Sequence, residues 1–255
     1  MSVNEEQISL FVATPVHSDV SINYFASCLD LQKECISNGV PIVIQLIKSS
    51  LVTQGRQLCV SAFLQSEATH LLFIDSDISF STKAIKRMIA KNKDIMLIPY
   101  PVKSFDSDKV KKLIKEGNNL DVRLIANQYT IGFIDPLKLK VEDGVAEIER
   151  GPAGCMLIKR EVFTKLINKY PNRKIKQHTL IDGVAVLKEN LYNFFDTYWN
   201  EEDNTYTGED FYFCKLCRDA GIKIYGLLDE YIVHYGDYGY KGRLIDELSL
   251  VKKEE

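Results

Sequence analysis

The sequence predicts an α/β fold with a mostly parallel central sheet flanked by helices and a less regular C-terminal half. Its short apolar runs lack polar alternation, as in strands that are buried on both faces of a sheet. These runs lie at residues 8–12, 41–47, 71–74 and 95–98. Helical patterns separate them, and this alternation is typical of a parallel sheet that helices cover on both faces.

The segments between the runs carry helix signals. Apolar residues recur at helical spacing from Ile22 to Leu29, and Asn38-Gly39 supplies a stop. Residues 55–68 predict a second helix, and Ser81 is a predicted N-cap for a third.

Ligands bind such sheets at the carboxyl ends of the strands. The first run ends at Thr14 and Pro15, and the third run ends at Asp75 and Asp77. We therefore expect these residues to share one crevice.

The second half is less regular than the first. It predicts helices at 106–116, 162–167 and 209–220, a hairpin at 139–148 and no clear period over 172–205. Gly117, Pro171 and Gly221 mark the ends of these helices, and Asp143-Gly144 turns the hairpin. No Pro-, Gly- or Ser-rich linker separates the halves, so we expect residues 1–255 to form one domain.

Composition is that of a globular protein. Of the 255 residues, 45% are hydrophobic and 26% charged, and the formal net charge of −3 gives no reason to expect nucleic-acid binding. The N-terminus has acidic residues where a signal peptide has positive charge, and no stretch approaches the roughly 18 apolar residues of a membrane span. We expect a cytoplasmic protein without a transmembrane segment, with work at a membrane surface left open.

The six cysteines are expected to be buried free thiols, because the chain is long and lacks a signal peptide. Cys214 and Cys217 form a CxxC. A closed zinc site needs four ligands, and no second CxxC or HxxxH follows, so metal or redox chemistry is disfavoured for this pair.

Asp75-Ser76-Asp77 is the sharpest local signal, because it directly follows the apolar run Leu71–Ile74. Two bare carboxylates would repel a nucleotide diphosphate. A divalent cation between them reverses that repulsion and stabilises the charge on the leaving diphosphate. The alternative is a polar turn at a strand end, but the position after a third buried strand favours function.

Two further motifs carry candidate chemistry. Glu209 and Asp210 begin a predicted helix, where a carboxylate could take the proton of an acceptor hydroxyl or simply complement the helix dipole. His234 ends a short apolar strand and is a candidate Mn²⁺ ligand or a core histidine bonded to backbone. Lys241 and Arg243 follow in a Gly- and Tyr-rich loop, where they could reach a diphosphate or stay solvated.

Three other features are candidates for ligand contact. Gly151-Pro152-Ala153-Gly154 is a small-residue loop that lets a ligand approach the backbone, or a tight turn before a strand. Arg56, at a predicted helix start, could pair with a phosphate or a pyrimidine ring, or lie on the surface. Trp199, the only tryptophan, could be a platform for an acceptor sugar or a core residue.

The order of these motifs resembles that of the GT-A glycosyltransferases, especially bacterial and viral family-2-like enzymes and the fungal mannan-polymerase-like group. The likeness covers residues 8–245. It implies a GT-A fold with a nucleotide-binding half at 1–103 and an acceptor and catalytic half at 104–255. Short chains of this kind occur in viruses as well as bacteria, so either origin is expected.

The resemblance implies roles on the donor side. Asp77 is expected to be a direct ligand of Mn²⁺ or Mg²⁺ and His234 a second, with Asp75 nearer the ribose or reaching the metal through water. Thr14 and Pro15 would contact the nucleotide base. Asp19 is the only nearby candidate for the acidic residue that binds uracil in many family-2 members, so the base stays open between UDP and GDP.

The resemblance also implies roles on the acceptor side. Asp210 corresponds to the general base of inverting members, and Glu209 is expected to position the acceptor or the loop. The glycine loop at 151–154 would lie near the donor sugar and the acceptor.

The predicted activity is the transfer of a single sugar, with inversion, to a hydroxyl of a glycan, lipid-linked or protein acceptor. One alternative is a sugar-nucleotide nucleotidyltransferase, although its Gly-rich, basic signature is missing from residues 13–17. Another is a catalytically inactive module that binds nucleotide sugars.

Overall fold

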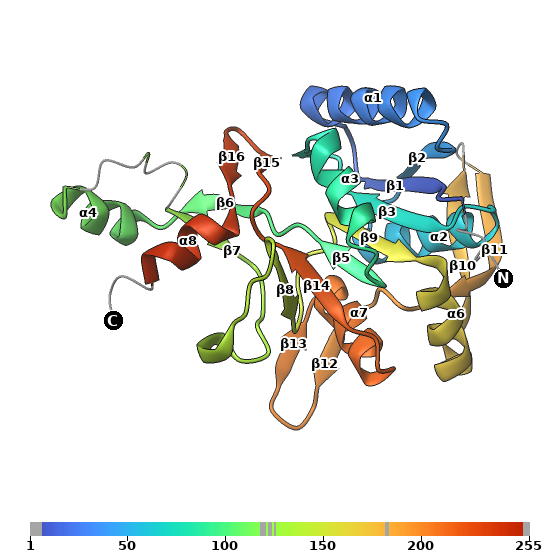
Figure 1. The fold of residues 1–255 in the computed structure, drawn as a ribbon. Coiled ribbons are helices and arrows are strands. Elements are labelled where there is room, and N and C mark those ends of the chain that lie inside the picture. Colours follow the sequence, from blue (N-terminus) through green and yellow to red (C-terminus); the bar gives the residue numbers. More distant parts are fainter. Residues whose placement is uncertain (1–6, 118–120, 122–123, 125, 182–183, 252–255) are drawn as a thin grey trace, which may run out of the picture.

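The computed structural model describes residues 7–117, 121, 124, 126–181 and 184–251. Its centre is a seven-stranded sheet with the order β2-β1-β3-β9-β5-β14-β8 (Figure 1). Five strands run in one direction: β1 (Leu10–Val16), β2 (Ile42–Lys48), β3 (His70–Ile74), β5 (Ile95–Leu97) and β14 (Ile224–Leu227). β8 (Val145–Ile148) and β9 (Cys155–Lys159) run against them. The predicted α/β architecture with a mostly parallel sheet is confirmed.

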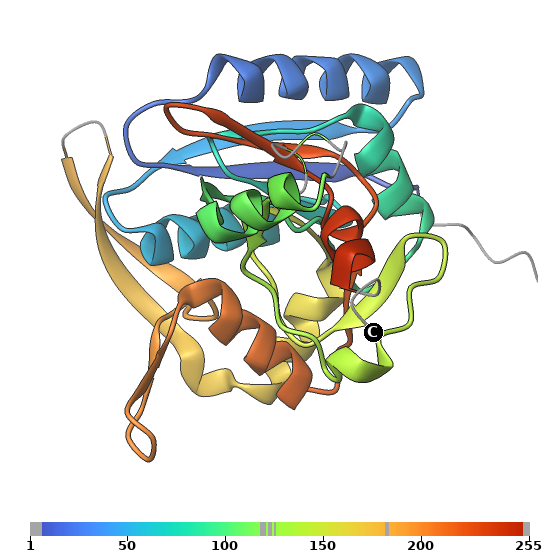
Figure 2. The same cartoon turned by 90° about the vertical axis from the view of Figure 1, so that its left-hand side faces the viewer.

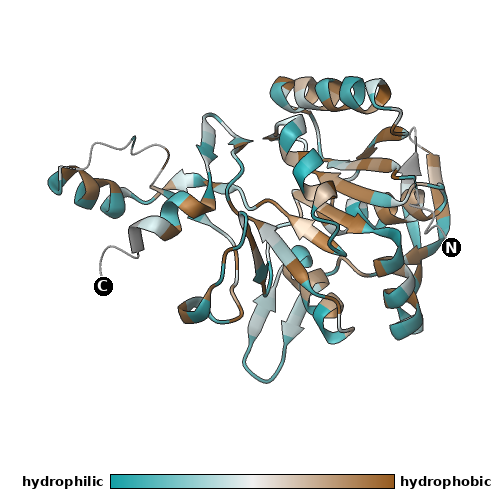
Figure 3. Ribbon diagram, in the orientation of Figure 1, coloured by the Kyte–Doolittle hydropathy of each residue, from teal (hydrophilic) through white to brown (hydrophobic). Residues whose placement is uncertain are grey.

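Helices cover both faces of this sheet (Figure 2). α1 (Ile22–Ser37) and α3 (Thr82–Ala90) pack on one face, and α2 (Val52–Leu64), α6 (Arg160–Lys169) and α7 (Glu209–Asp219) pack on the other. Along β1, Val12 packs toward α1 while Phe11 and Ala13 pack toward α2. Both faces of the strand are therefore buried, which explains the unbroken apolar runs (Figure 3).

The predicted strands and helices of the first half are present, with one correction at the first strand. β1 continues through Thr14 and Pro15 to Val16 because both residues keep the parallel register with β2. They therefore lie inside the strand rather than after it. β9 was not predicted at this position: it comes from the second half and inserts between β3 and β5, with Leu157 opposite both Leu72 and Met96.

The apolar residues that predicted α1 from their helical spacing do not form the face that packs on the sheet. Ile22 is 80% exposed, and Phe25 and Leu29 are also exposed. A second stripe packs on the sheet instead, formed by Tyr24, Cys28, Leu31 and Cys35. The spacing identified the helix, but the helix carries two apolar stripes.

The remaining elements lie outside the central sheet and its covering helices. They are β4 (Ile78–Ser79), β6 (Pro101–Phe105), α4 (Ser107–Lys115), β7 (Asn127–Tyr129), β10 (Lys174–Ile181), β11 (Val184–Tyr192), β12 (Tyr198–Asn200), β13 (Thr205–Thr207), β15 (Ile232–Tyr235), β16 (Gly239–Gly242) and α8 (Leu244–Val251). Short 3₁₀ turns lie at Pro136–Lys138 and Pro171–Arg173. α4, α6 and α7 confirm three predicted helices, whereas the two hairpins β10–β11 and β12–β13 fall where no period was expected.

The predicted hairpin at 139–148 is only partly correct. Asp143 and Gly144 have φ angles of 49° and 75° and make the turn. A single bridge joins Glu142 to Val145, and β8 then pairs with β14 rather than with the preceding residues.

All six cysteines are free and buried, as expected. Over the described ranges no helix has the length and apolarity to cross a membrane. Residues 1–6, which carry part of the expectation about a signal peptide, lie outside the described residues.

Candidate active site

Asp75-Ser76-Asp77 lies directly after β3, and three other segments hold its backbone. The Asp75 N–H donates to the Gly154 carbonyl at 2.9 Å, and the Ser76 carbonyl accepts from the Ser21 N–H at 2.8 Å. The Tyr235 N–H donates to the Asp77 carbonyl at 2.8 Å. The glycine loop, the start of α1 and the end of β15 therefore meet at this motif.

Arg56 joins this motif to the acidic start of α7. Its Nη2 donates to Asp75 Oδ1 at 3.0 Å, and its Nε donates to Glu209 Oε1 at 3.2 Å. The guanidinium is 3% exposed and lies 5.2 Å from the ring centre of Phe73 and 6.0 Å from that of Phe195. Arg56 was expected near a phosphate or a pyrimidine ring, but here carboxylates and aromatic rings surround it.

Asp210 lies beside this ion-pair network in the first turn of α7. Its Oδ1 accepts the Phe211 N–H at 2.8 Å. Burial, and then the charge of Glu209, raise the pKa of Asp210 to about 6, although Arg56 acts in the opposite direction. A carboxylate with this pKa is largely ionised at neutral pH and is more basic than an ordinary aspartate, as a general base requires.

Asp77 faces a different set of partners. Lys103 Nζ donates to its Oδ2 at 2.5 Å, and His234 Nε2 lies 3.4 Å from the same oxygen. Burial disfavours the charge on Asp77, but hydrogen bonds from His234 and Lys103 outweigh it and lower the pKa of this carboxyl to about 2. Asp77 is therefore ionised at all physiological pH values.

His234 is oriented by a backbone carbonyl. Its Nδ1 lies 2.9 Å from the Pro101 oxygen, and because a carbonyl can only accept, Nδ1 carries the hydrogen. In the neutral imidazole, Nε2 then presents its lone pair toward Asp77, whereas the charged form donates to that carboxylate. Histidines that bind metals are commonly oriented in this way.

Tyr100 is a site residue that the sequence analysis missed. Its hydroxyl donates to Asp75 Oδ2 at 3.5 Å, and its ring makes an edge contact with His234 at 5.0 Å between ring centres. Burial raises the pKa of Tyr100 well above the usual value, so its hydroxyl stays protonated. Only its place just after β5 could have signalled a role.

The glycine loop at 151–154 is buried against the motif. A Cβ at Gly154 would lie 2.5 Å from Asp75 Oδ2 and collide with the Tyr100 hydroxyl, so only glycine fits there. The Cys214 thiol of α7 reaches the Gly151 carbonyl at 3.6 Å. All four loop residues are buried, which ties the loop to the site but leaves its predicted contact with a sugar as an expectation.

Thr14 and Pro15 lie near the end of β1 and contact α1 and α2 respectively. Thr14 is fully buried, and its hydroxyl forms a 2.7 Å hydrogen bond with that of Tyr24 in α1. Pro15 packs beside Gly55, where a Cβ would lie 3.0 Å from the proline Cβ. The side chain of Thr14 is thus committed to the core, and Pro15 lies against Gly55, the residue that precedes Arg56 in α2.

Trp199 lies in the β12–β13 hairpin that leads into α7. It is 58% exposed and sits opposite Tyr206, which is 69% exposed, so it is not a core residue. Tyr198 stacks on Tyr212 of α7 at 5.1 Å, which anchors the hairpin to the helix that carries Asp210.

Lys241 and Arg243 are not brought to the acidic motifs by their described contacts. The Lys241 ammonium lies 4.9 Å from the ring centre of Tyr231, and the Arg243 guanidinium lies 4.4 Å from it. Arg243 also pairs with Asp246 at 2.7 Å. Lys241 pairs with Val233 across the β15–β16 ladder, and Val233 directly precedes His234. Because neighbouring residues of a strand point to opposite faces, Lys241 lies on the face opposite to that of His234.

The donors around Asp77 fit a divalent cation with an incomplete protein shell. Asp77 provides a carboxylate and His234 an imidazole nitrogen, which are both suitable for Mn²⁺-type ions. Asp75 is occupied by Arg56 and Tyr100. Within the part of the chain that the structure describes, no group of three or more His, Cys, Asp and Glu side chains is arranged to hold a metal.

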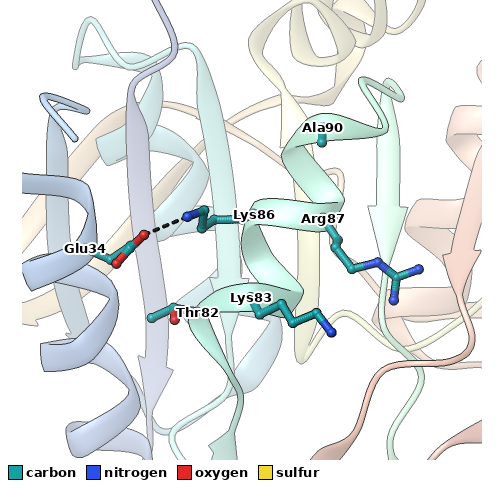
Figure 4. Close-up of a pocket in the computed structure, with 6 residues that line it drawn as sticks. All are labelled: Glu34, Thr82, Lys83, Lys86, Arg87 and Ala90. Carbon is teal, nitrogen blue, oxygen red and sulfur yellow. Dashed lines mark hydrogen bonds and ion pairs between the residues drawn. The ribbon is translucent and has the colours of Figure 1, made fainter. Parts of the chain in front are cut away.

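A shallow groove of about 440 Å³ lies elsewhere, between α1 and α3 (Figure 4). Lys86 and Arg87 line it, and both already pair with carboxylates: Lys86 with Glu34, and Arg87 with Asp229 and Glu230. None of the candidate catalytic residues lines this groove, so its size does not mark it as the active site.

Comparisons with known proteins give distant structural similarity only. No protein-family model and no curated sequence matches the chain. Protein A197 from STIV is 17% identical over 90% of this chain and 87% of its own, with a TM-score of 0.48. A glycosyltransferase involved in the glycosylation of the major capsid of PBCV-1 is 8% identical over 64% and 66%, with a TM-score of 0.32. S. aureus TarS 1-349 is 13% identical over 92% and 60%, with a TM-score of 0.40. At these values the site itself has to carry the argument about function.

Proposed function

We propose that this chain is a GT-A glycosyltransferase that moves a sugar, with inversion, from a UDP- or GDP-sugar to an acceptor hydroxyl, with Mn²⁺ or Mg²⁺ as cofactor. The observation that carries the proposal is the link from Asp75 through Arg56 to Glu209. It joins the acidic motif of the first half to that of the second. The motif that would bind the donor and the carboxylate of raised pKa, Asp210, are therefore both close to Arg56.

On the donor side, Asp77 and His234 would hold the metal. Pro101 orients His234 so that Nε2 faces Asp77, which supports this assignment. The bound cation would offset the charge of the diphosphate and stabilise it as a leaving group. Asp75, with its partners Arg56 and Tyr100, would fix the position of the motif rather than hold the cation.

On the acceptor side, Asp210 would act as the general base. Its carboxylate accepts the proton of the acceptor hydroxyl as that oxygen forms a bond to the anomeric carbon. The bond from this carbon to the diphosphate oxygen breaks on the opposite face, and the electron pair leaves with the diphosphate. Attack from the opposite face inverts the anomeric configuration.

Exposed rings beside the helix of Asp210 support a carbohydrate acceptor. Trp199 and Tyr206 form a cross-strand pair on the hairpin that precedes α7. Flat apolar rings of this kind suit the apolar faces of sugars. The acceptor would be a glycan, a glycolipid or a glycosylated protein.

Hydrolysis of UDP- and GDP-sugars in Mn²⁺ tests the proposal without an identified acceptor. Proton NMR of the released sugar, recorded before mutarotation, reports the anomeric configuration. We expect turnover of one donor class and release of the opposite anomer. Retention of configuration would contradict the role of Asp210. Release of pyrophosphate from a nucleoside triphosphate and a sugar 1-phosphate, with no donor hydrolysis, would identify a nucleotidyltransferase instead.

A further inference from the structure

Lys103 in β6 supplies the cation that Asp77 contacts in this structure. Its Nζ lies 2.5 Å from Asp77 Oδ2, and its side chain is 39% exposed. The same strand contributes Pro101, whose carbonyl orients His234. β6 therefore carries both Pro101, which orients the proposed metal ligand His234, and Lys103, which pairs with the other proposed ligand, Asp77.

The aliphatic part of the Lys103 side chain lies against the backbone of Gly236. A Cβ at Gly236 would lie 3.1 Å from Lys103 Cδ and 3.7 Å from Cγ and Cε. Gly236 is not among the glycines with positive φ, so here glycine serves close approach rather than backbone conformation. The preceding residue, Tyr235, donates its N–H to the Asp77 carbonyl. The lysine thus lies against a segment that is itself fixed to Asp77.

Lys103 and a divalent cation would require the same oxygen. Lys103 Nζ and His234 Nε2 both approach Oδ2 of Asp77. Two cations sharing one partly buried oxygen repel each other strongly. An ammonium on a flexible, half-exposed stem is the one that can leave.

We propose that Lys103 is an internal competitor of the metal: its ammonium neutralises Asp77 in the metal-free protein and has to be displaced when a divalent cation binds. This inference rests on the proposed function, because it assumes that Asp77 and His234 bind metal. It predicts that the protein binds metal more weakly than its two ligands alone would allow.

Titration of the full-length protein with Mn²⁺ alone, followed by the electron paramagnetic resonance of free Mn²⁺, tests this inference. Lys103→Met should tighten Mn²⁺ binding by about five- to tenfold, as expected for loss of a charged hydrogen bond at a half-exposed position. Lys169→Met on α6 makes the same change in net charge at an exposed position and should keep the parental affinity. Asp77→Asn should abolish specific binding. Thermal unfolding of each variant checks that it folds.

The outcomes separate this inference from the proposed function. If the parent binds Mn²⁺ through Asp77 and Lys103→Met binds it no more tightly, Lys103 is not a competitor, while the metal site stands. If Lys169→Met tightens binding as much as Lys103→Met does, net charge is the cause and the inference fails. If no variant binds Mn²⁺, even with UDP or GDP present, both the inference and the metal-dependent function are wrong.

Discussion

The two carboxylates of Asp75-Ser76-Asp77 lie in opposite kinds of surroundings. Asp75 faces a buried guanidinium, a tyrosine hydroxyl and a glycine with no room for a side chain. Asp77 faces a half-exposed ammonium and an imidazole nitrogen. The partners of Asp75 are fixed by the core, whereas those of Asp77 lie on flexible or titratable side chains.

This difference suggests that Asp75 and Asp77 have different roles in the proposed function. The Arg56 side, with Asp75, Glu209 and Asp210, is a largely buried ion-pair network. In the proposed function it would set the geometry and the pKa of the general base. The Asp77 side, with Lys103 and His234, is where we propose that a divalent cation replaces the lysine ammonium. The following experiments test whether the two sides behave so differently.

The largest expected effect comes from Asp210 on the Arg56 side. Asp210→Asn keeps the shape but cannot accept a proton, so transfer should fall by about two to four orders of magnitude. Donor affinity should stay near parental, because in the proposed function Asp210 would act on the acceptor rather than hold the diphosphate. Asp219→Asn, at the exposed end of the same helix, is the matched control. Near-parental turnover of Asp210→Asn in a steady-state assay would remove Asp210 from the mechanism.

Arg56 should matter next, through stability. Arg56→Met leaves Asp75 and Glu209 partly buried without their counter-charge, which should lower the free energy of unfolding by about 3 kcal/mol. Arg218→Met, at an exposed position of α7, should change it by less than about 0.5 kcal/mol. Denaturant unfolding measures both values. Equal stability of the two variants would show that Arg56 does not hold the network together.

A smaller effect should appear in the pH dependence of stability. The native state holds the proton of Asp210 up to a pH of about 6, whereas an unfolded aspartate loses it near its ordinary pKa. Ionisation of this carboxyl therefore stabilises the unfolded state at a lower pH than the native state. The free energy of unfolding should fall by about 2 kcal/mol as the pH rises from about 4 to 6. Asp210→Asn should lack this decrease. Parallel curves for parent and variant would contradict the raised pKa.

Asp77 should show the opposite sign in the same measurement. Its pKa is lowered to about 2, so its contribution to stability is present above its ordinary pKa and is lost as the pH falls toward 2. Asp77→Asn should therefore flatten only the acidic end of the curve.

The sequence predicted the elements whose signals are local. β1, β3 and β5 are buried on both faces, so each appears in the sequence as an apolar run. Asp75 and Asp77 stood out because they directly follow one of these runs. β9 could not be placed, because its insertion between β3 and β5 depends on residues far away in the chain. The exposed stripe of α1 misleads for a related reason: the sequence alone does not say which of two apolar stripes faces the sheet.

Residue type and order marked Asp210, His234 and Arg56 as candidate site residues, and in the structure they lie close to Asp75 or Asp77. Their pairings could not be predicted. Lys103 and Tyr100 were missed, because their roles come from where β6 and the end of β5 place them. The contact of Arg56 with two carboxylates likewise depends on how α2 meets both the end of β3 and the start of α7.

The central claim, that Asp77 rather than Asp75 is the exchangeable cation site, is tested most directly by nucleotide binding to Asp77→Asn. Calorimetry would measure the affinity for UDP and for GDP, each with and without Mn²⁺. We expect Mn²⁺ to tighten binding of one nucleotide to the parent by about tenfold or more, worth about 1.4 kcal/mol, and to leave its binding to the folded variant unchanged. The same Mn²⁺-dependent gain in Asp77→Asn as in the parent would contradict the claim.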